Sequence, residues 1–251
     1  MRKVIIGYCL FLMAAYALPA QDFSSFVTSM PQMKSVFSKL CADTPEFSAK
    51  ASIGLFDKQG ALRKTFPTRL ALTGDCMRQE FDVWEMSLFP PEQRASMKVA
   101  HLDKIVIITR IDKKEVYAVF PGVEAYSEFS IPDSVLNEIG VRTNALTIQK
   151  TELGQETVSG HSCMKIKVTV SEPNRPTEEA LLWCAADLQQ FPVKLEIYAK
   201  NGITKIDFQD VQIKRPDAAL FQVPANYIMF SSVKPIMDYA KDKLQGNSIP
   251  K

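Results

Sequence analysis

Few side chains in this sequence have the type and spacing that catalysis requires. The chain has two histidines, His101 and His161, and the second begins the run His161-Ser162-Cys163. A nucleophile and its base must meet in space, whereas adjacent residues on a strand point to opposite faces. The run therefore does not predict a catalytic pair. No G-x-S-x-G, H-E-x-x-H or phosphate-loop pattern occurs in the chain.

Acidic side chains give no stronger signal. Glu178-Glu179 and the pair Asp207 and Asp210 have lysines nearby in the sequence and are typical of solvated surfaces. The cysteines form no C-x-x-C pair that could bind a metal together with a histidine. We therefore expect a protein that is not an enzyme and uses no cofactor or metal.

The first twenty residues have the layout of a secretion signal. Arg2 and Lys3 precede an apolar core from Val4 to Met13, and cleavage is expected after Ala17 or Ala20. A membrane anchor would need a run of about 20 apolar residues. We expect a periplasmic or otherwise extracytoplasmic protein with no transmembrane span after cleavage.

Charge and cysteine content agree with export. Removal of Arg2 and Lys3 leaves 28 basic and 28 acidic residues, a balance that argues against a nucleic-acid partner. Five cysteines occur, and cleavage would remove Cys9 and leave an even number for an oxidising compartment.

Two strand patterns predict how these cysteines pair. Apolar and polar residues alternate from Cys163 to Val170, and a second strand is expected from Thr177 to Trp183. A hairpin symmetric about the loop between them places Cys163 opposite Cys184 and Met164 opposite Trp183. We expect a Cys163–Cys184 disulfide, which leaves Cys41 to pair with Cys76.

The same alternation recurs through most of the chain. One strand is expected from Phe47 to Leu55, and Asn201-Gly202 is a strong hairpin signal after the strand from Phe191. The apolar phase slips after Phe208, which predicts a bulge at Gln209 or Asp210. The pattern predicts a mainly β fold: a single curved antiparallel sheet that forms a half-open barrel, with helices over the concave face.

Domain organisation is expected to be simple. Residues 21–251 form one predicted domain, with an N-terminal helix at about 31–41 and a C-terminal helix at about 231–245, each marked by an apolar stripe at helical spacing. The sequence contains no internal repeat and no Gly/Ser linker.

Several short motifs lie at strand ends and turns in the body of the chain: Met77-Arg78-Gln79-Glu80, Tyr117 to Gly122, Gly154 through Gly160 to Cys163 and Lys165, Trp183-x-Ala185-x-Asp187-Leu188, Phe191 to Lys194, and Phe221 to Pro224. With these motifs the chain resembles the LolA/LolB-like family of periplasmic lipoprotein carriers and its relatives of unknown function. The resemblance implies a half-open barrel whose apolar concave face receives acyl chains in the carriers.

Two functions remain open from the sequence. The first is an exported binding or carrier protein whose partner is a lipid or a lipoprotein acyl chain. The second is an envelope interaction or sensor module with the same fold, a filled core and a protein partner. Both use one apolar surface, which is expected to consist of Phe47, Ile53, Leu72, Phe81, Val83, Met164, Ile166, Trp183, Leu195, Ile197, Ile206 and Phe208.

Overall fold

The computed structural model describes residues 46–86, 90–145, 147–171, 177–199 and 202–245. The predicted signal segment, the helix expected at 31–41 and Cys41 lie outside these ranges.

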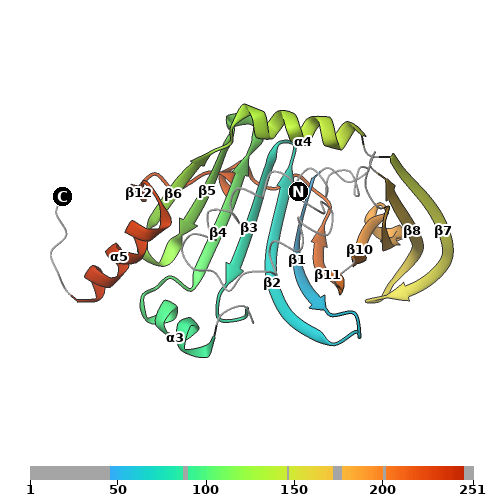
Figure 1. Cartoon of the computed structure of the whole chain (residues 1–251), viewed down its shortest axis with the longest axis horizontal. Helices are drawn as coiled ribbons and strands as arrows, with labels where there is room; N and C mark the ends of the chain where they lie inside the picture. The colour runs from blue at the N-terminus through green and yellow to red at the C-terminus, as the bar shows by residue number, and fades with distance from the viewer. Residues whose placement is uncertain (1–45, 87–89, 146, 172–176, 200–201, 246–251) are drawn as a thin grey trace.

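The described residues form one curved sheet of twelve strands (Figure 1). The first six make an antiparallel meander: β1 (Phe47–Phe56), β2 (Leu62–Thr73), β3 (Cys76–Asp82), β4 (Lys104–Arg110), β5 (Glu115–Phe120) and β6 (Ala125–Ser130). The next five make a second meander: β7 (Thr147–Val158), β8 (His161–Ser171), β9 (Glu178–Ala185), β10 (Phe191–Ala199) and β11 (Gly202–Gln212).

Pairing of β1 with β11 joins the two meanders side by side. The outer edge of the first meander carries a short parallel strand, β12 (Ile228–Phe230), beside β6. This strand is the one parallel pairing in the described sheet, and the sequence did not predict it. The mainly β, open curved sheet is confirmed.

In the described ranges, three α-helices accompany the sheet: α3 (Pro91–Val99), α4 (Asp133–Ala145) and α5 (Val233–Leu244). Helix α4 runs along the ends of the strands and links β6, near one edge, to β7, at the other (Figure 1). Helix α5 lies within the range expected for the C-terminal helix. Single 3-10 turns occupy η1 (Ile111–Lys113), η2 (Pro121–Val123), η3 (Ala186–Leu188) and η4 (Ala218–Phe221).

The two faces of the sheet bury separate apolar clusters. The larger cluster includes side chains from α3, α4 and α5 and marks the concave face. The smaller cluster, centred on Val106, Ile108 and Val119, lies on the convex face, where Phe221 of η4 covers it. Strand alternation explains the division, because successive residues point to opposite faces.

Local turn chemistry explains several strand ends. Asp57 Oδ1 accepts hydrogen bonds from the backbone nitrogens of Gln59 and Ala61, which shapes the turn between β1 and β2. Gly74-Asp75 forms the two-residue turn between β2 and β3. The predicted bulge is confirmed, since the β1–β11 register shifts at this point and Asp210 has a φ of +51°.

The predicted β8–β9 register is wrong by one residue. Cys163 lies opposite Ala185, and Cys184 lies opposite Met164, so the two cysteines do not face each other. A one-residue shift places them on opposite sides of the pleat, and the expected Cys163–Cys184 disulfide is absent. Cys76 is a thiol whose Sγ lies 3.8 Å from Asp112 Oδ1. Its pairing with Cys41 stays a prediction.

The β10–β11 hairpin is shifted by two residues. Leu195 lies opposite Ile206 and Ala199 opposite Gly202, rather than Leu195 opposite Phe208 as a turn at Asn201-Gly202 would require. A shift of two residues preserves which side chains share a face. The concave assignment of this hairpin is therefore correct despite the altered pairing.

Candidate ligand-binding face

One row of apolar side chains crosses six neighbouring strands of the concave face. The directly paired residues are Phe66, Ile53, Ile206, Leu195, Leu182 and Ile166, from β2, β1, β11, β10, β9 and β8 in that order. We call this set the apolar row. Five of its members are buried, and Ile166 at its outer end is half-buried. With strands about 4.8 Å apart, the row is about 24 Å wide.

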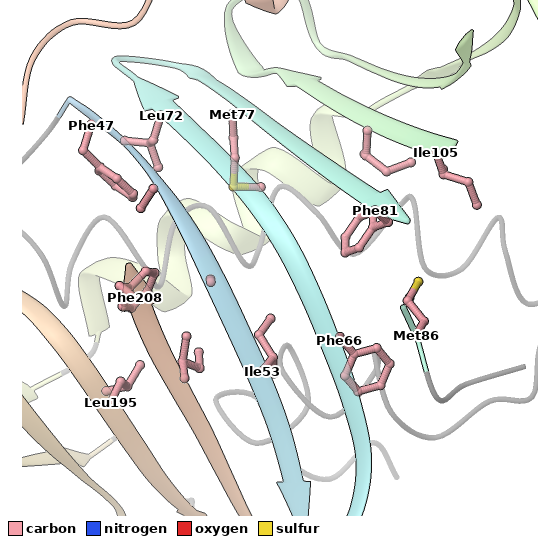
Figure 2. Packing of buried hydrophobic residues seen from close by; sticks show 14 of the residues in the cluster. Phe47, Ile53, Phe66, Leu72, Met77, Phe81, Met86, Ile105, Leu195 and Phe208 are labelled. Atoms are coloured by element: carbon pink, nitrogen blue, oxygen red, sulfur yellow. The ribbon is translucent and has the colours of Figure 1, made fainter. Parts of the chain in front are cut away.

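Figure 2 shows part of this surface, with Phe66, Ile53 and Leu195 below Phe47 and Phe208. Three aromatic rings pack together at this end of the strands. The ring of Phe191 lies 4.8 Å from that of Phe47 and 5.2 Å from that of Phe208, centre to centre. Tilted and edge-on rings at these distances are a favourable arrangement.

Two further rows continue the concave face across β3 to β6. One contains Leu70, Gln79, Ile107, Ala118 and Ser127, and the other contains Leu72, Met77, Thr109, Val116 and Phe129. Most members are apolar, and all except the half-buried Leu70 and Phe129 are buried. Gln79, Thr109 and Ser127 are the polar members, and the side-chain oxygen of each is buried with no hydrogen-bond partner.

The described helices contribute unequally to the cover of this face. Helix α5 buries Ile236 and Ala240, and α4 packs the half-buried Val135 and Leu136 against the cluster. Helix α3 buries none of its side chains fully. Helix α3 therefore contributes little to the cover of the concave face.

Most of the predicted lining residues come together. Phe47, Ile53, Leu72, Phe81, Val83, Leu195, Ile197, Ile206 and Phe208 are buried members of the larger cluster, and Ile166 packs against it. Met164 is half-buried opposite Cys184. Trp183 does not share the face of the apolar row, because the adjacent Leu182 occupies it.

Trp183 is a buried member of the larger cluster, and its ring also contacts charged side chains of the neighbouring strands. It lies between Lys165 and Lys194 in register, and their Nζ atoms are 5.0 Å and 4.4 Å from the ring centre. Its indole nitrogen donates to Glu156 Oε2. Cations over an aromatic face are attracted to it, so these contacts stabilise the strand pair. The role of Trp183 as a lining residue stays a prediction.

Sequence reasoning missed several concave residues. Phe66 on β2 is fully buried but was not among the predicted lining residues. The three residues before it, Arg63, Lys64 and Thr65, are all polar and show no alternation. Leu182 was missed because of the one-residue register error. The concave residues of β4 to β6 were predicted as strand but not as lining.

Two of the hollows in the described part of the molecule lie beside residues of the convex face. One, of about 350 Å³, is lined by charged residues that already pair with one another, including Lys104 with Asp82 and Arg78 with Glu80 beside it. The other, of about 260 Å³, lies between the sheet and the segment around η4. Arg78 and Arg110 fix that segment by donating to the carbonyl oxygens of Leu220 and Phe221.

The described residues offer little for catalysis. His161 Nδ1 lies 2.8 Å from Asp187 Oδ2 at the surface, while burial raises the pKa of the Cys163 thiol. A thiol with a raised pKa is a poor nucleophile at neutral pH. Within the described ranges, no three His, Cys, Asp or Glu side chains are placed to hold a metal ion. Nor does any described helix have the length and apolarity needed to cross a membrane.

Residues 84–191 match a family described as a domain of unknown function, DUF4412. No curated protein matches the chain. Among solved structures, the chain is similar to the lipoprotein LppX of Mycobacterium tuberculosis, with 13% identity and a TM-score of 0.42 over 74% of this chain and 97% of that one.

Two further solved structures are similar. A LolA superfamily protein of Nitrosomonas europaea has 12% identity and a TM-score of 0.31 over 82% of this chain and 98% of that one. MucA/MucB of Pseudomonas aeruginosa gives 12% identity and a TM-score of 0.39 over 78% of this chain and 62% of that one. The curved, mainly β sheet implied by the resemblance is present in the described residues, and the function has to be argued from the chain's own residues.

Proposed function

We propose that this chain is an extracytoplasmic, non-catalytic protein that binds the acyl chain of a lipid or lipoprotein on its concave face. The observation that carries the proposal is the apolar row across six strands. Its width of about 24 Å suits an extended acyl chain, and transfer of each methylene group from water to this surface would contribute about 0.8 kcal/mol. The secretion-signal layout of residues 1–20 supports the location.

Access requires movement of a covering element. The inner members of the row, such as Ile53 and Ile206, are only 3% exposed. Ile166, at the β8 end, is the more accessible member. We infer that an acyl chain would first contact the sheet at this end.

Native mass spectrometry of the protein purified from its own envelope tests the proposal, together with uptake of a fluorescent fatty acid. We expect bound lipid and saturable uptake. Ile166→Gln should weaken uptake, whereas Lys167→Gln, the next residue on the other face, should not. Absence of lipid in repeated preparations and no uptake by the wild type would refute acyl-chain binding.

The second candidate is an envelope interaction module with a filled core. The close packing of Phe47, Phe191 and Phe208 favours it, because interlocked rings leave no room for a ligand at that end of the sheet. This function predicts a specific protein partner that is captured from envelope extract and stays bound after lipid is removed. It also predicts a wild-type protein that takes up no fatty acid.

A further inference from the structure

The concave face of β3 to β6 contains three polar side chains that an apolar core would not need. Gln79 is 2% exposed, and Thr109 and Ser127 are each 0% exposed. Gln79 Oε1, Thr109 Oγ1 and Ser127 Oγ have no hydrogen-bond partner. Leaving a buried polar group unpaired is unfavourable, and native proteins carry few such groups.

Register brings these three groups into one region. Gln79 lies opposite Ile107, and Thr109 is two residues further along β4, which makes them diagonal neighbours about 7–8 Å apart. Ser127 lies in the same row as Gln79, on β6, about 10 Å across the sheet from β4. A compact polar group could therefore contact Gln79 and Thr109 together, and a second polar atom could contact Ser127.

Buried polar side chains elsewhere on the same face can have hydrogen-bond partners, as Thr68 shows. Thr68 on β2 is 5% exposed, and its hydroxyl donates to the carbonyl oxygen of Glu80 across 2.9 Å. Within the first meander, β1 to β6, the buried side-chain atoms without a hydrogen-bond partner lie on β3, β4 and β6.

The surroundings define the charge of a ligand that these groups could bind. In the strands described, the concave positions of β3 to β6 carry no charged side chain: they are Met77, Gln79, Phe81, Ile105, Ile107, Thr109, Val116, Ala118, Phe120, Ala125, Ser127 and Phe129. A charged head group would be buried there without a counter-ion, which is very unfavourable. Hydroxyl and carbonyl oxygens suit amide and hydroxyl side chains.

We propose that Gln79, Thr109 and Ser127 form a polar subsite for the uncharged head of an acyl ester, such as a glyceride, whose acyl chain lies on the apolar row. This inference rests on the proposed function and adds a preference among lipids. It assigns hydrogen-bonding roles to three residues that otherwise only weaken the core.

Displacement of the neutral fluorescent probe N-phenylnaphthylamine from the full chain tests the subsite, with oleoylglycerol and octadecene as competitors. The wild type should bind oleoylglycerol more tightly than octadecene. Thr109→Val and Ser127→Ala should each weaken oleoylglycerol binding roughly 2- to 10-fold, and Gln79→Leu should act in the same direction. Octadecene binding should not change in any of them.

Melting temperatures provide the control. Replacing an unpaired buried hydroxyl with a methyl group should leave the melting temperature unchanged or raise it. Thr68→Val, which removes a paired hydroxyl, should lower the melting temperature without changing the preference for oleoylglycerol.

The outcomes separate this subsite from acyl-chain binding itself. If the wild type binds both competitors equally, or if folded Thr109→Val and Ser127→Ala proteins keep the preference, water satisfies these groups and the subsite is refuted while the proposed function stands. If neither competitor displaces the probe, or the probe does not bind, both proposals fail.

Discussion

The indole nitrogen of Trp183 donates a hydrogen bond to Oε2 of Glu156 across 2.7 Å, and Lys165 Nζ donates to Oε1 of the same carboxylate across 2.8 Å. The bond from Lys165, followed by that from Trp183, lowers the pKa of Glu156 below its ordinary value of 4.5. Glu156 on β7 thereby ties the edge strand of the sheet to β8 and β9.

The lowered pKa of Glu156 predicts the pH dependence of this tie. Because the carboxylate is favoured in the folded state, its contribution is complete above the ordinary pKa of 4.5 and is lost as the pH falls through the lower, folded-state pKa. Wild type should therefore melt above Glu156→Gln near neutral pH, and the gap should shrink below pH 4.5. Melting curves measured across this range check it. A gap that stays constant into acid would show that the charge is not responsible.

Truncation of a buried side chain in the apolar row should lower the stability of the fold. Phe66 is 0% exposed, and Phe66→Ala should reduce the free energy of unfolding by about 3–5 kcal/mol through lost burial and the cavity left behind. Leu62, on the same strand but 53% exposed, is the matched control, and Leu62→Ala should change stability by about 0.5 kcal/mol or less. Urea denaturation measures both. Equal losses would contradict the position of Phe66 in the core.

Disulfide mapping tests the corrected register. Cys163 pairs in register with Ala185, so peptides from the unreduced protein should include none that links Cys163 to Cys184. Because Cys163 is buried and its pKa is raised, its alkylation should be slow in the native protein and rapid after denaturation. A linked peptide would restore the hairpin first expected from the sequence.

Two glycine substitutions should have opposite effects. A Cβ atom at Gly122 would lie 2.2 Å from the carbonyl oxygen of His101, whereas a Cβ atom at Gly140 in α4 would meet nothing within 4 Å. Gly122→Ala should cost about 1–3 kcal/mol through overpacking. Gly140→Ala should stabilise the protein by about 1 kcal/mol, since glycine is a poor helix former. Thermal unfolding gives both signs, and a neutral Gly122→Ala would contradict the close approach.

Alternation along single strands was enough to predict the sheet. The predicted strand at Lys104–Arg110 coincides with β4, and the slip in phase after Phe208 located the bulge at Asp210. These features depend on the two-residue repeat of a strand and on local backbone geometry. Both are determined by residues that are close together in the sequence.

Pairing between strands was harder to predict because it depends on where a turn is made. A symmetric loop between Val170 and Thr177 placed Cys163 opposite Cys184, but a displacement of one residue exchanged Leu182 for Trp183 on the concave face. The displacement of two residues at Gly202 left Leu195 and Ile206 on the face that the sequence predicted. An error in strand register by an odd number of residues moves side chains to the other face of the sheet, whereas an error by an even number keeps them on the same face.

The polar subsite residues could not be recognised from the sequence. Gln79 lies between two other polar residues, Arg78 and Glu80, so its burial is not evident from the sequence. Thr109 and Ser127 are ordinary strand residues. That the oxygens of all three are buried and lack partners follows only from the packing of distant strands around them.

The seam between β1 and β11 has a consequence for how the molecule assembles. One strand opens the described chain and the other comes near its end, so the sheet can be completed only after both meanders exist. Contacts this distant in sequence form slowly, because a long loop must close before they contribute. Until then β1 and β11 each present an unpaired edge of the kind that promotes aggregation.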